Sequence, residues 1–299
     1  MSRIFEALKR SSGADSAAAR NVLPADQQEL LEAAGVAGST SDESRALHAA
    51  GLDEFDVGPK SELPYVKLDL DGKSPLLPFD VGRSQAAEQY RIVRTKILQH
   101  KMQPRRLIVS SPESGDGKSI NAVNLAGVLA LNPEANVLLV DGDLHRCSLA
   151  KFFKVPSTPG LGEVLSGDVK VSEAVVRIEG HSNLFFLPGG KGARASAELL
   201  DSRRAKRLSD ALGKQFTYMV IDSPPAGAVA DFDLLMQNGD GVVLILRQDH
   251  TNRMLCMKTI EAIPKEKLVG VILNYVKPWF LGKTFGYYQY YHYSKYYRR

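Results

Sequence analysis

One stretch of the sequence decides the fold: RLIVSSPESGDGKSINAVNLAGVLA, residues 106–130. Its first six residues form an apolar run that is typical of a buried strand. Its last twelve residues, from Ser119, have the pattern of a helix. Between them lies PESGDGKS, residues 112–119, which has two glycines followed by a lysine and a hydroxyl. The order of strand, glycine-rich loop and helix is the context that a Walker A phosphate-binding loop requires.

The residue types of this loop suit the phosphates of a nucleotide. Gly115 and Gly117 let backbone N–H groups turn inward around phosphate oxygens, because no side chain stands in the way. The helix that begins near Lys118 directs the positive end of its dipole at the same anion. Lys118 can reach the β- and γ-phosphates, and the Ser119 hydroxyl can ligate Mg²⁺. The general pattern has a glycine where this chain has Pro112. The predicted ATP-binding residues are Ser114, Gly115, Asp116, Gly117, Lys118, Ser119 and Ile120.

Further apolar runs alternate with helical patterns along the chain. Near-continuous Val, Ile and Leu runs suit strands that are buried on both faces. The alternation predicts an α/β fold of the P-loop NTPase-like, doubly wound class, with a mainly parallel sheet and helices on both faces. The other predicted strands are residues 136–141, 183–188, 218–223, 241–247 and 268–274.

Three aspartates follow two of these strands. Asp141 and Asp143 lie at the end of VLLVD and just beyond it, and Asp222 lies at the end of YMVID. Ligands of an open parallel sheet bind outside the carboxyl ends of its strands, so all three acids are expected near Lys118 and Ser119. Phosphoryl transfer needs carboxylates to hold Mg²⁺ and a group that accepts the proton of the attacking hydroxyl. Three aspartates can divide these tasks, and the spacing does not say which takes which.

The composition is that of an ordinary globular protein. The 299 residues are 44% hydrophobic and 24% charged, and the net charge of +4 is too mild to suggest a nucleic-acid partner. Cys147 and Cys256 are too few for a disulfide framework or a zinc site. No apolar run approaches the roughly 18–20 residues that cross a bilayer, and the first ten residues lack a signal peptide's apolar region. We therefore expect a cytoplasmic protein.

Four regions are expected along the chain. Residues 1–10 have the pattern of a short amphipathic helix, and residues 11–80 are expected to be a mostly disordered linker. The folded domain should span residues 84–275, beginning with a helix at 84–100. Residues 276–299 form a flexible tail that holds seven of the eleven tyrosines. These tyrosines are Tyr287, Tyr288, Tyr290, Tyr291, Tyr293, Tyr296 and Tyr297.

With these motifs in order, the sequence resembles the bacterial tyrosine kinases of exopolysaccharide and capsule systems, the CpsD/CapB-like kinases. The likeness covers about residues 84–275 and the tyrosine tail. SSPESGDGKS resembles the family's Walker A region, VLLVDGDLHRCSL its second motif, and YMVIDSPP its Walker B motif. The stretch EQYRIVR, residues 88–94, is similar to its E-x-x-R-x-x-R oligomerisation motif.

The resemblance implies roles for individual residues. Lys118 and Asp141 would be catalytic, with Asp141 as the base that takes the proton of an incoming tyrosine. Ser119, Asp143 and Asp222 would hold Mg²⁺. Glu88, Arg91 and Arg94 would form contacts that close a ring of subunits, and the seven tail tyrosines would accept phosphate from a neighbouring subunit.

Two positions depart from the family's pattern. The second motif usually reads D-x-D-x-R, whereas here His145 takes the last position and Arg146 follows it. The family's Asn-Pro before the ELL segment is Ala195-Ser196 in this chain. We expect His145 to be a solvated loop residue.

The resemblance also implies partners and a location. They are a membrane-spanning polysaccharide chain-length regulator that acts as activator, and a cognate phosphotyrosine phosphatase. The kinase would lie at the inner face of the plasma membrane through the activator, and would regulate polysaccharide synthesis or export.

The alternative hypothesis is a nucleotide-switched ATPase of the MinD/ParA kind, whose tail would bind membrane or nucleic acid. Such ATPases usually carry an extra lysine early in the loop. Glu113 and Ser114 occupy that neighbourhood here, which favours the kinase.

Overall fold

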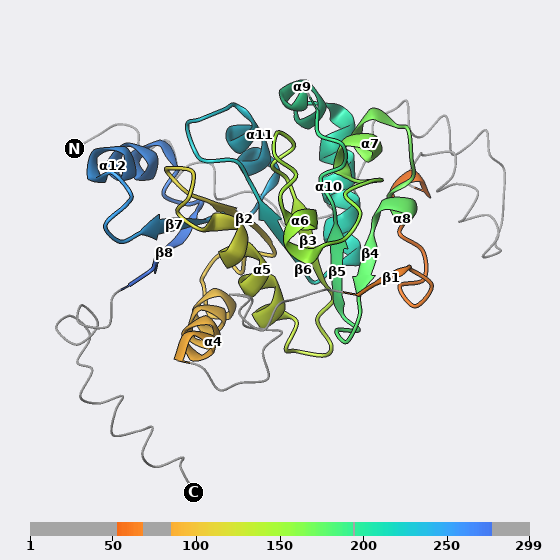
Figure 1. Ribbon diagram of the computed structural model, residues 1–299, viewed down its shortest axis with the longest axis horizontal. Coiled ribbons are helices and arrows are strands. Elements are labelled where there is room, and N and C mark those ends of the chain that lie inside the picture. The colour runs from red at the N-terminus through yellow and green to blue at the C-terminus, as the bar shows by residue number, and fades with distance from the viewer. Residues whose placement is uncertain (1–52, 68–84, 194, 277–299) are drawn as a thin grey trace, which may run out of the picture. The chain divides into compact units, whose positions relative to one another are not determined.

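The computed structural model describes residues 53–67, 85–193 and 195–276, which contain one eight-stranded sheet (Figure 1). Its strand order is β1-β4-β5-β3-β6-β2-β7-β8. The strands are β1 Tyr65–Val66, β2 Arg106–Ser110, β3 Val137–Asp141, β4 Val176–Ile178, β5 Leu184–Leu187, β6 Tyr218–Asp222, β7 Gly241–Arg247 and β8 Leu268–Asn274. Six of these match the predicted runs to within two residues at each end. The two short strands β1 and β4 were not predicted from the sequence.

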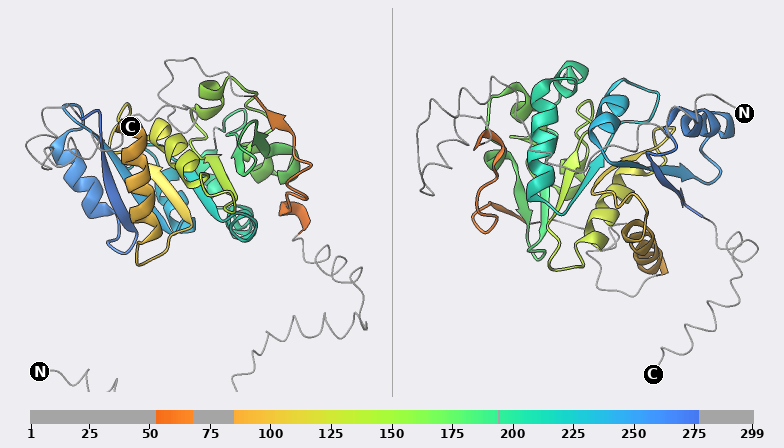
Figure 2. Two further views of the ribbon diagram at one scale, coloured as in Figure 1. Left: turned by 90° about the horizontal axis from the view of Figure 1, so that it is seen from below. Right: turned by 180° about the vertical axis from the view of Figure 1, so that it is seen from behind.

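Helices connect most of the strands and pack on the sheet (Figures 1 and 2). They are a 3₁₀ helix η1 Asp53–Phe55, then α4 Gln85–Leu98, α5 Lys118–Leu129, α6 Leu149–Phe153, α7 Leu161–Ser166, α8 Val171–Ala174, α9 Ser196–Leu200, α10 Arg203–Gln215, α11 Asp231–Asn238 and α12 Arg253–Ala262. In the described residues no helix combines the length and the apolar character that crossing a membrane requires.

The central strands divide their side chains between two hydrophobic cores. In β3, Leu138 and Val140 pack on one face with residues of α7 to α11, whereas Val137 and Leu139 pack on the other with residues of α4 to α6. Neighbouring side chains of a strand point to opposite faces, so a continuous apolar run fills both cores. The sheet is mainly parallel, and the pair β4–β5 is antiparallel. The predicted fold class is confirmed.

The register of the central strands determines where the site forms. Strand β6 lies between β3 and β2, and Asp141 of β3 is paired with Asp222 of β6. The phosphate loop leaves β2 one residue beyond Val109, which is itself paired with Asp222. Three adjacent parallel strands therefore bring the loop and both strand-end aspartates to one edge of the sheet.

Residues 53–67 correct part of the predicted linker at 11–80. This segment forms η1 and the edge strand β1, which pairs in parallel with β4. Phe55, Val57 and Leu63 are buried in the core that also contains α10. These three apolar residues are separated by polar ones, so the sequence shows no continuous apolar run here. A short strand at the edge of a sheet needs few apolar residues.

Replacing Phe55 with alanine is expected to destabilise the protein by about 3–5 kcal/mol, since it empties a fully buried aromatic site. The guanidinium groups of Arg204 and Arg207 lie 5.1 and 5.3 Å from the centre of the Phe55 ring and would lose that contact too. Urea unfolding of the full chain measures the change. As a control, Tyr65→Ala removes an exposed aromatic of the same segment and should cost much less. Equal costs for the two variants would contradict the docking of Phe55.

Several predictions lie outside the described residues. They are the amphipathic helix at 1–10, the linker at 11–52 and 68–80, and the tail from residue 277 with its seven tyrosines.

Candidate active site

The phosphate loop has the backbone conformation that its glycines permit. Gly115 and Gly117 have φ values of +93° and +95°, a region that residues with a side chain rarely adopt. Gly117 is also the N-cap of α5, so the helix begins at Lys118 as predicted. A Cβ atom on Gly117 would lie 2.2 Å from Nδ2 of Asn274, so any other residue would also displace that side chain. The loop thus offers inward-turned amides beside a helix N-terminus, the arrangement that binds phosphate.

Lys118 lies among the carboxylates. Its Nζ is 3.3 Å from Oδ2 of Asp143 and 3.8 Å from Oδ1 of Asp222. All three side chains are almost completely buried. A buried charge without a partner is strongly destabilising, so the lysine and the two carboxylates each offset the cost of burying the other. The structure therefore unites the loop lysine with two of the predicted aspartates.

Asp141 is the third member of the cluster. Its Oδ2 accepts a 2.9 Å hydrogen bond from the backbone N–H of Leu149, while its Oδ1 is buried and accepts none from the described residues. Burial raises the pKa of Asp141 to about 7, and repulsion from the neighbouring Asp222 adds to the effect. Burial likewise raises the pKa of Asp222 to about 6, although Lys118 opposes that shift. A carboxyl that gains and loses a proton near neutral pH suits a general base.

The donor set fits a hard divalent cation. Both oxygens of Asp222 are buried and accept no hydrogen bond within the part of the chain that the structure describes. Oδ1 of Asp141 is likewise buried and accepts no hydrogen bond from the described residues. Carboxylate oxygens and a serine hydroxyl are the ligands that Mg²⁺ uses in sites that also bind phosphate. The Asp222 oxygens, of which Oδ1 has only the 3.8 Å ion pair with Lys118, are what a cation and its water ligands would satisfy.

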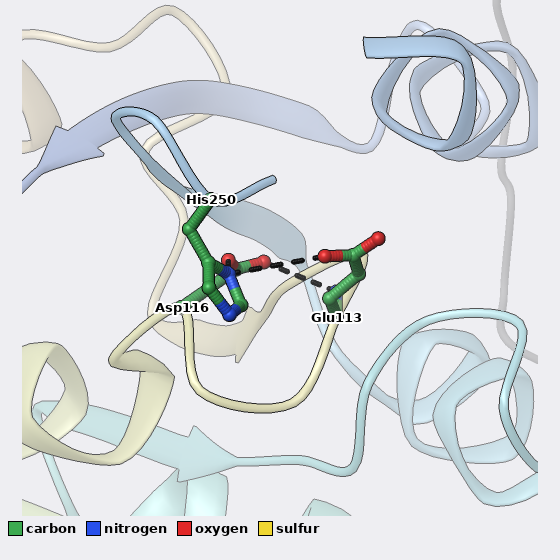
Figure 3. A group of neighbouring side chains, drawn as sticks. All are labelled: Glu113, Asp116 and His250. Carbon is green, nitrogen blue, oxygen red and sulfur yellow. Dashed lines mark hydrogen bonds and ion pairs between the residues drawn. The ribbon is translucent and has the colours of Figure 1, made fainter. Parts of the chain in front are cut away.

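Contacts from other elements hold the loop from outside. Asp116, between the two glycines, is fully buried and accepts hydrogen bonds from Thr251 and His250 of the segment after β7. Figure 3 shows the contact with His250. Arg247 donates to the carbonyl of Gly115 at 3.1 Å, and Asn274 at the end of β8 donates to the carbonyl of Asp116 at 2.9 Å. None of these four residues was predicted from the sequence to belong to the site. Their position at the ends of two predicted strands, beside the loop, is the signal that could have found them.

The two departures from the family's pattern lie together. His145 is exposed, as expected, but its Nε2 is also 3.0 Å from Oγ of Ser196 and 3.3 Å from Oδ2 of the buried Asp231. Arg146, the next residue, donates a 2.8 Å hydrogen bond to Oγ of Ser114 in the phosphate loop. An arginine therefore contacts the phosphate loop from the position after His145.

The residues of the predicted oligomerisation motif lie on α4. Glu88 and Arg91 form an ion pair of 2.9 Å on its half-exposed face. The helix packs on α5, where Tyr90 donates a 2.8 Å hydrogen bond to Asn121. Nε of Arg94 is buried and has no hydrogen-bond partner among the described residues.

Comparison with known proteins identifies the relatives of this chain. The chain is 34% identical over 196 residues to tyrosine-protein kinase YwqD of Bacillus subtilis, which covers 64% of this chain and 82% of that kinase. It is 29% identical over 240 residues to tyrosine-protein kinase ptk of Acinetobacter johnsonii, covering 78% of this chain but only 32% of that longer protein. The crystal structure of the chimerical protein CapA2B2 superposes with a TM-score of 0.64 at 27% identity, over 72% of this chain and 95% of the other. No protein-family model matches the chain.

The sheet, the phosphate loop and the lysine among buried aspartates define a P-loop protein of the kind that moves phosphoryl groups. The 34% identity to YwqD, over 82% of that kinase, identifies one family within this class of P-loop proteins. The chain belongs to the bacterial tyrosine-protein kinases, enzymes that transfer phosphate from ATP to protein tyrosine.

Proposed function

We propose that this kinase phosphorylates its own C-terminal tyrosines, one subunit acting on the tail of another, and thereby regulates the synthesis or export of a capsular or extracellular polysaccharide. The observation that carries the catalytic part is the position of Lys118, between Asp143 and Asp222 beneath a loop shaped for phosphate. The acceptor part is supported by the seven tyrosines that end the chain.

The proposed site divides its tasks among named residues. The loop amides and Lys118 bind the phosphates of ATP, which is the substrate. Ser119, Asp143 and Asp222 would hold Mg²⁺, which supplies charge neutralisation at the β- and γ-phosphates. Asp141 would take the proton of the tyrosine hydroxyl, whose pKa of about 10 makes it a poor nucleophile until a base holds it. Its unpartnered Oδ1 is the atom available for that proton.

Assembly and regulation complete the proposal. Glu88, Arg91 and Arg94 of α4 would contact a neighbouring subunit in a ring, which brings one tail to the next active site. Two similarities support a partner protein, here a membrane-spanning chain-length regulator: one to the solved chimera CapA2B2, and one of 26% identity over 224 residues to the putative tyrosine-protein kinase CapB of Staphylococcus aureus. A phosphotyrosine phosphatase would reverse the modification. The kinase would then work in the cytoplasm, at the membrane face where its activator lies.

A mixing experiment tests transfer between subunits. One chain is Lys118→Ala with an intact tail, and the other is active but has its seven tail tyrosines changed to phenylalanine. After incubation with Mg²⁺ and ATP, phosphopeptide mapping should find phosphotyrosine on the tail of the Lys118→Ala chain. Neither chain alone should gain tail phosphate, because one lacks the catalytic lysine and the other the acceptors.

Phosphate that appears only when lysine and tail belong to the same chain would contradict transfer between subunits. If the wild-type chain hydrolyses ATP but forms no phosphotyrosine, even with the cytoplasmic segment of a candidate activator present, the proposal of an autokinase is wrong. The MinD/ParA-like switch would then be the better hypothesis.

A further inference from the structure

The Asp116 side chain is an anchor of the phosphate loop. Asp116 lies between the two glycines that give the loop its shape, and its side chain is fully buried. Figure 3 shows it facing His250, with Glu113 beside both. A carboxylate that is removed from water needs hydrogen-bond donors, since leaving it unpaired is costly. The hydrogen-bond donors to Asp116 therefore identify the residues on which the conformation of the loop depends.

Three donors satisfy the Asp116 carboxylate. The Thr251 hydroxyl donates to Oδ1 at 2.7 Å, and Nδ1 of His250 lies 3.0 Å from the same oxygen. The backbone N–H of Glu113 donates to Oδ2 at 3.1 Å. An ionised carboxylate only accepts, so Nδ1 of His250 carries the proton in this contact. Two of the three donors thus come from the segment after β7, far from the loop in sequence.

Glu113, Asp116 and His250 also lie close enough together to share a cation, with ligand atoms within 4.8 Å of one another. Both Asp116 oxygens are already occupied by hydrogen bonds, however, and the one that faces His250 accepts two. A cation would have to displace these donors. The geometry fits a clamp better than a metal site.

We propose that His250 and Thr251 are positioning residues of the kinase, which hold the phosphate loop in its nucleotide-binding conformation through the side chain of Asp116. The carbonyl contacts of Arg247 and Asn274 act on the same loop, so it is held on its carboxylate and on two of its carbonyls. The inference rests on the proposed use of this loop to bind ATP.

The clamp raises the affinity for nucleotide because it increases the fraction of molecules whose phosphate loop is in the binding-competent conformation. Without its anchor, a loop with two glycines samples many backbone conformations. The apparent dissociation constant rises as the fraction of the binding-competent conformation falls. Saturating ATP restores that conformation, so the turnover number should change little. Loss of the clamp is therefore expected to raise the KM for ATP and the Kd of ADP.

Calorimetric titration of the full chain with Mg²⁺-ADP tests the clamp. Thr251→Val and His250→Ala should each raise the Kd about tenfold, because each removes a hydrogen bond to a buried charge. Thr251→Ser restores the hydroxyl, and His250→Asn places an amide donor near the position of Nδ1, so both should return the Kd close to the wild-type value. KM for ATP should follow the Kd, while kcat at saturating ATP stays within about twofold.

Thr217→Val is the matched control. The Thr217 hydroxyl accepts a 3.2 Å hydrogen bond from the backbone N–H of Asn136, just before strands β6 and β3 begin, at the other end of the sheet. The substitution should lower the melting temperature without changing the Kd. If Thr251→Val and His250→Ala bind Mg²⁺-ADP as tightly as wild type, the inference is overturned. It is equally overturned if they lower kcat and the melting temperature but leave the Kd unchanged. Failure of the wild-type chain to bind nucleotide would instead overturn the proposed function.

Discussion

The kinase with Lys118 replaced by methionine is expected to lose tyrosine phosphorylation by at least about 100- to 1000-fold, the cost of removing one group that stabilises the charge of the transition state. Lys118 is the cation that the structure places at the phosphate loop within 4 Å of two buried carboxylates. Methionine keeps the length of the side chain but not its charge. The initial rate of phosphotyrosine formation at saturating Mg²⁺-ATP measures the loss.

The same substitution has a second expected effect. Asp143 and Asp222 would stay buried without their cation, and an uncompensated buried charge is strongly destabilising. The nucleotide-free variant should therefore melt below the wild type at pH 8. Part of that loss should disappear near pH 5, because burial raises the pKa of Asp222 to about 6 in the wild type and the variant lacks the lysine that lowers it, so Asp222 is mostly protonated there. Lys206→Met is the control, because Lys206 is exposed on α10. A Lys118→Met chain that phosphorylates at more than a tenth of the wild-type rate would contradict the role of the lysine.

The sequence predicts the central part of the fold because each of its buried strands carries a continuous apolar run. Strands β7 and β8 coincide with the predicted 241–247 and 268–274 residue by residue. Strand β7 lies between two cores and must be apolar on both faces. Strand β8 lies at an edge of the sheet and is only partly buried, yet its apolar run predicts it as well. The shorter strands β1 and β4 lie toward one edge and carry no such run, which is why the sequence gives no sign of them.

The candidate site divides in the same way. Lys118, Asp141, Asp143 and Asp222 could be predicted, because a phosphate loop and strand-end carboxylates must meet at the carboxyl edge of a parallel sheet. The residues that hold the loop could not. Nothing in the sequence says that Arg146 rather than His145 reaches Ser114, since this depends on the exact turn after Asp143. The contacts of His250 and Thr251 with Asp116 depend likewise on strand order, which places β7 next to β2.

Asp141 offers the second prediction of large effect. Asparagine at this position keeps an oxygen to accept the N–H of Leu149 but cannot take a proton from tyrosine. General-base catalysis contributes about 10²- to 10⁴-fold, so Asp141→Asn should lower kcat by an amount in that range. The Kd of Mg²⁺-ADP should change far less, because the loop and Lys118 remain. Asp168→Asn, which alters an exposed aspartate, serves as the control and should leave kcat unchanged.

The same variant should be more stable than the wild type when metal and nucleotide are absent. The folded protein raises the pKa of Asp141 from 3.8 to about 7, so it favours the protonated form. The stabilising effect of that proton is complete below about pH 4 and is lost as the pH rises toward 7. At pH 8 the wild type must keep an ionised carboxylate beside Asp222, at a cost on the order of a few kcal/mol, whereas asparagine carries no charge. The melting temperature of Asp141→Asn should therefore exceed that of the wild type at pH 8, and the difference should shrink toward pH 4. A difference that is independent of pH would mean that Asp141 titrates normally, and that its environment is not tuned for proton transfer at neutral pH.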